Sequence, residues 1–348
     1  MKKRRIIKYT ILSFFLLIMI TFATFSVILH SRITSMMSIK KKGESLYTMN
    51  YKKNYHLDKA LKAGITNEEE LLDFICDEMF FGYKIDADFS KYGCSAFLTK
   101  TPNGDNIVCR NFDLLGTDTL SVYTNPSNGY ASVSTVSTDM VGVGGKDGLK
   151  ETSLKGRIAL LASPYIAVDG VNEKGLSASL LDMCYGETHM LSDKPDIIIT
   201  MAIRLLLDKA ANIEEAINLL KQYNIHSAHG STQHIFIADK SGRSVIVEWY
   251  KLEMNIVEYN CCTNFVMSEP IITSYTGLCD RFDIIDGALK EKNINTIEES
   301  MDLLEKVKQK SSSTHTIWSV IYNLNDFSVN YCVDLNYDDM YHLNPKKN

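Results

Sequence analysis

The chain has 348 residues, 45% of them hydrophobic, which is enough apolar material for one large core or two smaller ones. The first 42 residues hold nine Lys and Arg and no acidic residue, so the remaining 306 hold 28 basic against 42 acidic residues, a formal charge of −14. Such an acidic body lacks the basic face that nucleic-acid phosphates require, which argues against a nucleic-acid partner.

The N-terminal segment, residues 1–30, begins with a basic cluster that is followed by an uncharged stretch over residues 9–29. At 1.5 Å per residue, a helix of that length just crosses a hydrocarbon core of roughly 30 Å. No A-x-A-like cleavage site precedes His30, so we expect an uncleaved signal anchor with residues 6–29 in the membrane. The basic tip then stays cytoplasmic and the body lies outside the cell membrane, whereas a cleaved signal peptide would give a secreted body.

Residues 31–93 are expected to form a leader or propeptide, and residues 94–348 the main domain. The leader is polar and favours helix. Asn67, followed three residues later by Glu70, precedes a pattern of spaced apolar residues. This capping pattern predicts a helix that packs on the main domain.

The main domain begins with two short strands that flank a Pro-Asn-Gly turn, so we expect them to pair as a hairpin. The order of the elements after it is strands, a helix pair, strands, a helix and strands. This order predicts an α+β layered sandwich built on antiparallel sheets. The expected strands are 95–100, 106–112, 158–168, 234–239, 244–249, 251–259, 318–324 and 328–334. Residues 172–175 are expected to form a turn between apolar runs, and the expected helices are 195–208, 212–223 and 296–308.

The eight cysteines contain no C-x-x-C pair and suggest no disulfide framework, although an oxidising exterior would permit disulfides. The eight histidines lack the spacing of a zinc site. The sequence therefore predicts no metal centre, and nothing in it indicates an oligomeric state.

Five motifs occur in one order along the chain: Cys94; R-N-F-D, which begins sixteen residues later; D-G-V-N-E-K-G-L at 169–176; C-T-N at 262–264; and D-R-F at 280–282. Together they resemble the choloylglycine hydrolase family, N-terminal-nucleophile (Ntn) amide hydrolases that include bile salt hydrolases and penicillin V acylases, with acid ceramidase and N-acylethanolamine amidase as relatives. The resemblance implies an αββα sandwich that cleaves linear amides through a cysteine thioester, without a cofactor.

The chemistry of a thiol explains why an internal cysteine would be used. A free thiol is only a few per cent ionised at neutral pH and needs an adjacent base. Cleavage between Gly93 and Cys94 would place a new α-amino group, with a pKa near about 8, beside the thiol as that base.

The resemblance also implies roles for the residues in the motifs. Arg110 would lie near the Cys94 thiol and favour its anion, and Asp113 would orient the α-amino group. Asn264 would donate to the oxyanion of the tetrahedral intermediate, and Arg281 would complete the polar shell. The alternatives are a surface ion pair for the first two, a turn amide for Asn264 and a helix cap for Arg281.

The sequence departs from the bile salt hydrolases at two points. Asp182 stands where those enzymes usually have Asn, and a carboxylate donates no hydrogen bond unless it is protonated. Either the backbone N–H serves there, or Asp182 contacts the α-amino group or the substrate. Arg281 follows Asn264 by only seventeen residues, where bile salt hydrolases carry a longer insertion. With the anchor and leader, this favours the ceramidase and amidase branch over a bile-salt substrate.

Several apolar side chains are candidates for the wall of an acyl pocket, with core packing as the alternative. The candidates are Met183, Tyr185, Phe265, Trp318 and Tyr322. The predicted function is hydrolysis of a small N-acyl amide by Cys94; an acyltransferase on the same fold and a non-enzymatic surface binding protein are the alternatives.

Overall fold

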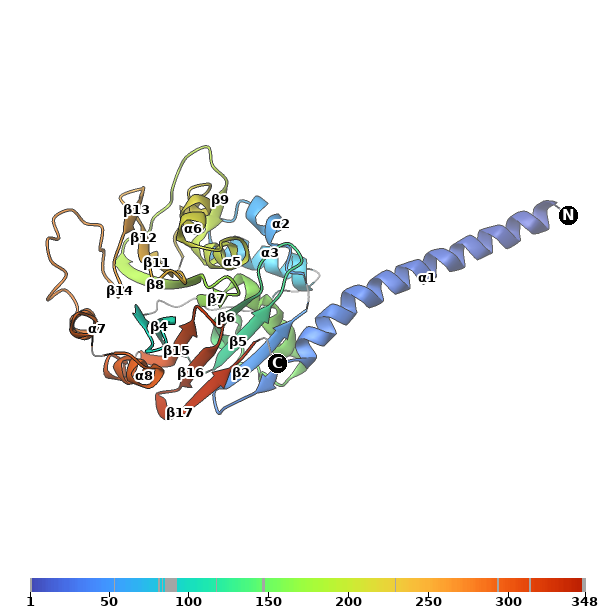
Figure 1. Ribbon diagram of the computed structural model, residues 1–348. Coiled ribbons are helices and arrows are strands. Elements are labelled where there is room, and N and C mark those ends of the chain that lie inside the picture. Colours follow the sequence, from blue (N-terminus) through green and yellow to red (C-terminus); the bar gives the residue numbers. More distant parts are fainter. Residues whose placement is uncertain are drawn as a thin grey trace.

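The computed structural model describes residues 2–345 except 53, 81, 83, 85–92, 117, 146–147, 229, 293 and 313. Two stacked sheets form the body (Figure 1). The larger sheet is antiparallel except for the parallel pair β2 and β5. Its strands, in spatial order, are β1 (Lys40–Lys41), β2 (Leu46–Tyr51), β5 (Thr119–Thr124), β6 (Ser132–Ser137), β7 (Asp169–Asn172), β8 (Ser177–Tyr185), β11 (Thr232–Ala238), β12 (Ser244–Tyr250) and β13 (Glu253–Val257).

The smaller sheet is antiparallel throughout and carries Cys94 on its second strand. A separate parallel pair, β9 (Asp196–Ile198) with β10 (Asn224–His226), lies outside both sheets. The strands of the smaller sheet, in spatial order, are β14 (Cys261–Cys262), β3 (Gly93–Lys100), β4 (Asn106–Leu114), β15 (His315–Asn323), β16 (Val329–Val333) and β17 (Asn336–Leu343).

Helices cover the outer faces of the two sheets. On the larger sheet, α5 packs on β7 and β8; on the smaller, α8 packs on β4 and β15, and α7 on β3 and β14. The result is the predicted αββα layering. The helices are α1 (Lys2–Met37), α2 (Leu57–Lys62), α3 (Glu68–Phe80), α4 (Leu154–Ala159), α5 (Ile199–Lys209), α6 (Ile213–Leu220), α7 (Asp280–Glu291) and α8 (Ile297–Lys306), with 3-10 turns at η1 (Thr138–Val141) and η2 (Leu160–Tyr165).

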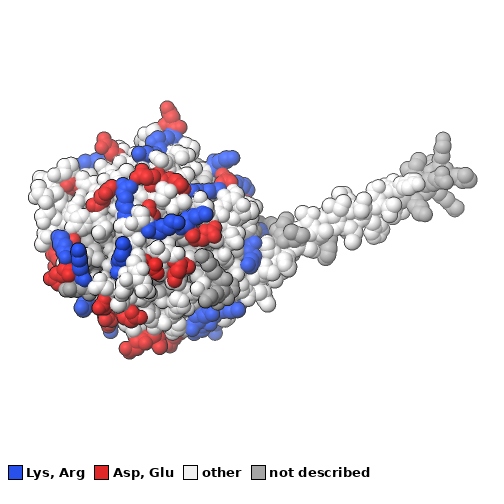
Figure 2. All heavy atoms as spheres, in the orientation of Figure 1, with Lys and Arg blue, Asp and Glu red and all other residues white. Residues whose placement is uncertain are grey.

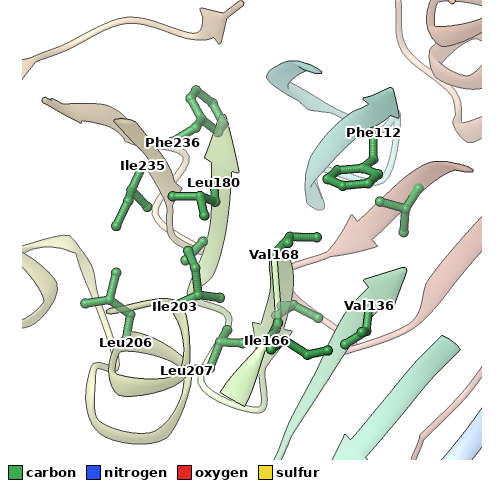
Figure 3. Close-up of a cluster of buried hydrophobic side chains, with 14 of the residues drawn as sticks. Phe112, Val136, Ile166, Val168, Leu180, Ile203, Leu206, Leu207, Ile235 and Phe236 are labelled. Carbon is green, nitrogen blue, oxygen red and sulfur yellow. The ribbon is translucent and has the colours of Figure 1, made fainter. Parts of the chain in front are cut away.

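The core lies on both sides of the larger sheet. Figure 3 shows Ile203 and Leu206 of α5 on the side of the strands that carry Leu180 and Ile235. In the smaller sheet, helices cover one face and the larger sheet covers the other, so every residue of β4 is buried. The polar residues of this strand must therefore find partners inside the protein.

Most of the elements predicted from turn and capping residues are confirmed. The strands on either side of the Pro-Asn-Gly turn pair as β3 and β4, β11 pairs with β12, and β12 pairs in turn with β13. The expected cap of α3 is present, because Asn67 Oδ1 accepts from the backbone N–H of Glu70 at 3.0 Å. The predicted helices starting at residues 212 and 296 are formed as α6 and α8, which follow the N-cap residues Asn212 and Thr296.

The strand predicted over residues 158–168 is wrong, because this run is helical in α4 and η2. An unbroken apolar run does not distinguish a buried strand from a buried helical segment. Here Ser153 accepts from the backbone N–H of Gly156 and starts a helix. The helix predicted over 195–208 begins only at Ile199, because residues 196–198 pair with β10.

The N-terminal region differs from its prediction in two ways. The leader is not only helical, since β2 joins the larger sheet beside β5. Helix α1 is continuous and projects away from the body in Figure 1. In the part of the chain that the structure describes, no helix combines the length and apolar character needed to span a membrane, so the predicted anchor over residues 6–29 is not supported. On the face shown in Figure 2, acidic and basic side chains alternate over the body.

Leader and body share buried hydrogen bonds, which predicts that the leader is part of the folding unit. Tyr55 OH donates to Asp208 Oδ2 in α5 at 2.6 Å. Replacing Tyr55 with Phe should lower the free energy of unfolding by about 1.5–3 kcal/mol, measured by urea denaturation, because a buried carboxylate loses a donor. Tyr47→Phe is the control, since its hydroxyl lies 3.4 Å from Glu151. Equal effects of the two substitutions would contradict the prediction.

Candidate active site

The side chains of R-N-F-D alternate between the two faces of β4. Arg110 and Phe112 point between the sheets, where Arg110 reaches the thiol of Cys94. Asn111 points outward and donates to the backbone of α8, and Asp113 binds a side chain of α7. Because side chains three apart on a strand lie on opposite faces, Arg110 reaches the thiol of Cys94 while Asp113 turns to the outer face.

Arg110 is the partner of the Cys94 thiol. Its Nη2 lies 3.1 Å from Sγ and also donates to the carbonyl of Leu180. Its Nη1 donates to the Val168 carbonyl at 2.9 Å and forms an ion pair with Asp169. Arg110 and all of these partners are fully buried, so both terminal nitrogens of the guanidinium are held inside the protein.

The Cys94 thiol is protonated at neutral pH in the uncut chain. Burial raises the pKa of this thiol to about 11, and the charge of Arg110 opposes part of that rise. The side chain has no exposed surface. A reaction at Cys94 therefore needs both a base for its proton and an opening of the site.

The nitrogen of Cys94 is held by a second set of residues. Its backbone N–H donates to Asn264 Oδ1 at 2.9 Å. Arg281 donates through Nη2 to the same oxygen at 2.6 Å and through Nη1 to Asp113 Oδ2 at 2.8 Å. Asp113 also accepts from Thr316 at 2.6 Å, and burial raises the pKa of its carboxyl against these bonds. Asp113 is thus linked to the Cys94 nitrogen through Arg281 and Asn264.

Asp182 directs its backbone, not its carboxylate, to this cluster. Asn264 Nδ2 donates one hydrogen to the carbonyl of Asp182 at 2.7 Å, and Nδ2 carries a second hydrogen. The carboxylate of Asp182 accepts from Ser231 Oγ at 2.7 Å and from the backbone N–H of Cys184 at 2.6 Å. Neither of these two bonds involves the Cys94 nitrogen.

The candidate pocket residues divide into core and surface positions. Trp318 stacks on Phe112 with ring centroids 4.1 Å apart, and both Trp318 and Tyr322 are fully buried, so packing describes them better than a pocket wall. Met183 is buried as well. Tyr185 is 40% exposed, and Phe265 packs against Phe282 of α7 at a centroid distance of 5.2 Å.

Asp169 is the main site residue that the sequence analysis did not single out. Its carboxylate accepts from Arg110, Trp318 and Tyr322 without exposure to solvent. The available signal was an acidic residue at the start of D-G-V-N-E-K-G-L, directly after an apolar run. In the described residues, no group of three or more His, Cys, Asp or Glu side chains is arranged to hold a metal ion.

Comparison with known proteins adds the family. A family model described as acyl-coenzyme A:6-aminopenicillanic acid acyl-transferase matches residues 162–338, half of the chain. The chain belongs to this family. The resemblance to the choloylglycine hydrolases, predicted from the five motifs, is also confirmed by the proteins that are similar to this chain.

Penicillin V acylase of Pectobacterium atrosepticum is 33% identical over 92 residues, which are 23% of this chain and 24% of that protein. The match thus spans about a quarter of the relative. A mutant of conjugated bile acid hydrolase from Clostridium perfringens superposes on 73% of this chain and 93% of its own, with 18% identity and a TM-score of 0.53. Penicillin V acylase from Agrobacterium tumefaciens has 16% identity, 73% and 87% coverage, and a TM-score of 0.50. These two structures establish the fold.

The Arg110–Asp169 pair predicts a large loss of stability when its carboxylate is removed. Asp169→Asn should lower the free energy of unfolding by about 3–5 kcal/mol, because it leaves a buried guanidinium without a counter-charge. Urea denaturation would measure the change. Glu214→Gln is the control, since Glu214 pairs with Arg243 at the surface and is 68% exposed. A similar small change in both variants would argue against a charged Arg110–Asp169 pair.

Proposed function

We propose that this chain is an Ntn amide hydrolase that uses Cys94 as its nucleophile after cleavage of the Gly93–Cys94 bond. The observation that carries the proposal is that two separate sets of side chains hold the two reactive groups of Cys94. Arg110 lies at its sulfur, and Asn264, backed by Arg281, lies at its nitrogen. Family membership and the two hydrolase folds support it.

Maturation would use the same thiol. Sγ attacks the carbonyl carbon of Gly93, the C–N bond to Cys94 breaks as its nitrogen takes up a proton, and water then hydrolyses the thioester. The products are a carboxylate on Gly93 and a free α-amino group on Cys94. A Cβ at position 93 would lie 3.3 Å from Gln309 and 3.4 Å from Asp113, so glycine leaves the most room at this bond.

In the catalytic cycle, the α-amino group takes the thiol proton and Sγ attacks the acyl carbon of the substrate. The second hydrogen of Asn264 Nδ2 would donate to the resulting oxyanion. The C–N bond breaks, the proton passes to the leaving amine, and water releases the acyl group as a carboxylic acid. Arg110 favours the thiolate at the start of each cycle. The substrate class is a small N-acyl amide, as the names of the relatives suggest.

Cleavage before Cys94 is the first prediction of this proposal. Intact mass and N-terminal sequencing of the purified full-length chain should show a new terminus at Cys94, while Cys94→Ala should stay uncut because it lacks the nucleophile. Matured protein should then release the fluorophore from N-acyl aminomethylcoumarins of varied acyl length. An uncut parent chain that is also inert toward these amides and toward thiol-directed probes would instead support a non-enzymatic binding protein.

An acyltransferase is the second candidate, because the matching family model is described as an acyl-transferase. Both activities pass through the same thioester and differ only in whether water or an amine attacks it. We therefore expect a hydrolase to give the free acid as its main product even with a millimolar amine acceptor present. Mass spectrometry of the products, with and without hydroxylamine or 6-aminopenicillanic acid, would measure this partition. A main product that is the new amide would favour the transferase.

A further inference from the structure

A buried acid and histidine on the larger sheet hold the loop that carries Asn264. His234 in β11 and Glu248 in β12 are direct neighbours across the hairpin and are both fully buried. His234 Nδ1 lies 2.9 Å from Glu248 Oε1, and His234 Nε2 lies 2.9 Å from the carbonyl of Thr263. Glu248 also accepts from the backbone N–H of Met267 at 2.9 Å and of Ser268 at 2.8 Å. Both ends of the loop 263–268 are thus tied to one side-chain pair.

The protonation of the pair follows from its partners. Both ring nitrogens of His234 face acceptors, and the Thr263 carbonyl has no hydrogen to give, so Nε2 must carry one. Burial alone would raise the pKa of Glu248, but the hydrogen bond from His234 and its charge lower it, which favours a carboxylate at Glu248.

The thiol of Cys262 lies 3.2 Å from His234 Nε2, so the three side chains resemble a Cys-His-acid triad. The environment argues against a second nucleophile. Cys262 is fully buried, and burial raises the pKa of its thiol well above the ordinary value. His234 Nε2 also already points at the Thr263 carbonyl. The arrangement suits support of the backbone better than chemistry at sulfur.

The loop needs such support. Asn264 follows β14, which has only two residues and lies at the edge of the smaller sheet, so few ladder bonds position it. We propose that His234 and Glu248 are positioning residues, which fix the loop 263–268 so that the Asn264 carboxamide stays at the nitrogen of Cys94. The inference rests on the proposed function, and it adds two residues that touch neither the thiol nor the substrate. Removing the residues that orient the ligands of a metal site typically lowers activity by about 10–100-fold, and we expect a loss of activity of similar size here.

A double-mutant cycle with Asn264 tests the proposal in the matured full-length protein. His234→Gln should lower kcat for the best aminomethylcoumarin amide by about tenfold or more, with KM changed by less than about threefold. In an Asn264→Ala background the same substitution should lower kcat by less than about twofold, because the group it positions is gone. Glu248→Gln should behave alike. His226→Gln is the matched control, since His226 also binds a carboxylate, Asp196, but away from this loop.

Independent effects of His234→Gln and Asn264→Ala that multiply, or an unchanged kcat in both His234→Gln and Glu248→Gln, would overturn the proposal. Should His234→Gln not fold, Glu248→Gln is judged by the same cycle.

Hydrogen exchange gives a readout that needs no activity. Backbone amides of residues 263–268 should exchange faster in His234→Gln and Glu248→Gln than in the parent and His226→Gln, as measured by mass spectrometry. A parent that neither cleaves itself nor turns over any amide would refute the proposed function. The exchange result would then decide the positioning role by itself, and unchanged exchange would reject it.

Discussion

The burial of the Arg110 charge between the two sheets is the constraint on which the rest of this structure depends. A guanidinium without exposed surface must be paired and hydrogen-bonded, or its desolvation would cost several kcal/mol. Asp169 supplies the counter-charge, and the carbonyls of Val168 and Leu180 accept further hydrogens. Because these partners belong to the larger sheet while Arg110 belongs to the smaller, the pairing also fixes how the sheets stack.

This constraint extends to the aromatic core. The carboxylate of Asp169 is itself buried, so it accepts from Trp318 and Tyr322 on β15, next to β4. Trp318 in turn stacks on Phe112, two residues from Arg110. Trp318 and Tyr322, which the sequence offered as candidates for an acyl-pocket wall, therefore belong to the packing that keeps Arg110 beside the Cys94 thiol.

Local signals made much of the fold predictable. Turn and capping residues, such as Asn67 for α3, identified their elements, because each acts within a few residues of itself. The strand β2 was not predictable, since it joins the main part of the sheet by pairing with β5 some seventy residues later. Residues 158–168 were misassigned as a strand for a related reason. They form a buried helical segment, and an apolar run that is buried in the tertiary structure shows no helical periodicity in the sequence.

The site was predictable in its membership but not in its connections. Motif spacing selected Cys94, Arg110, Asp113, Asn264 and Arg281, and the structure brings all five together. A separation of three residues on a strand implies that Arg110 and Asp113 lie on opposite faces of β4, but it does not identify their hydrogen-bond partners. The roles of Thr316 and Glu248 depend on contacts between distant segments, which one sequence does not display.

The uncut chain already holds the Cys94 nitrogen in the geometry that the proposed mechanism needs. As an amide, this nitrogen donates its hydrogen to Asn264 Oδ1 and has no basic lone pair. Cleavage would turn it into an amine, which can keep the same donated hydrogen bond while gaining a lone pair for the thiol proton. Since β2 anchors the leader in the larger sheet independently of that bond, maturation on this mechanism changes one functional group and leaves the surrounding sheets in place.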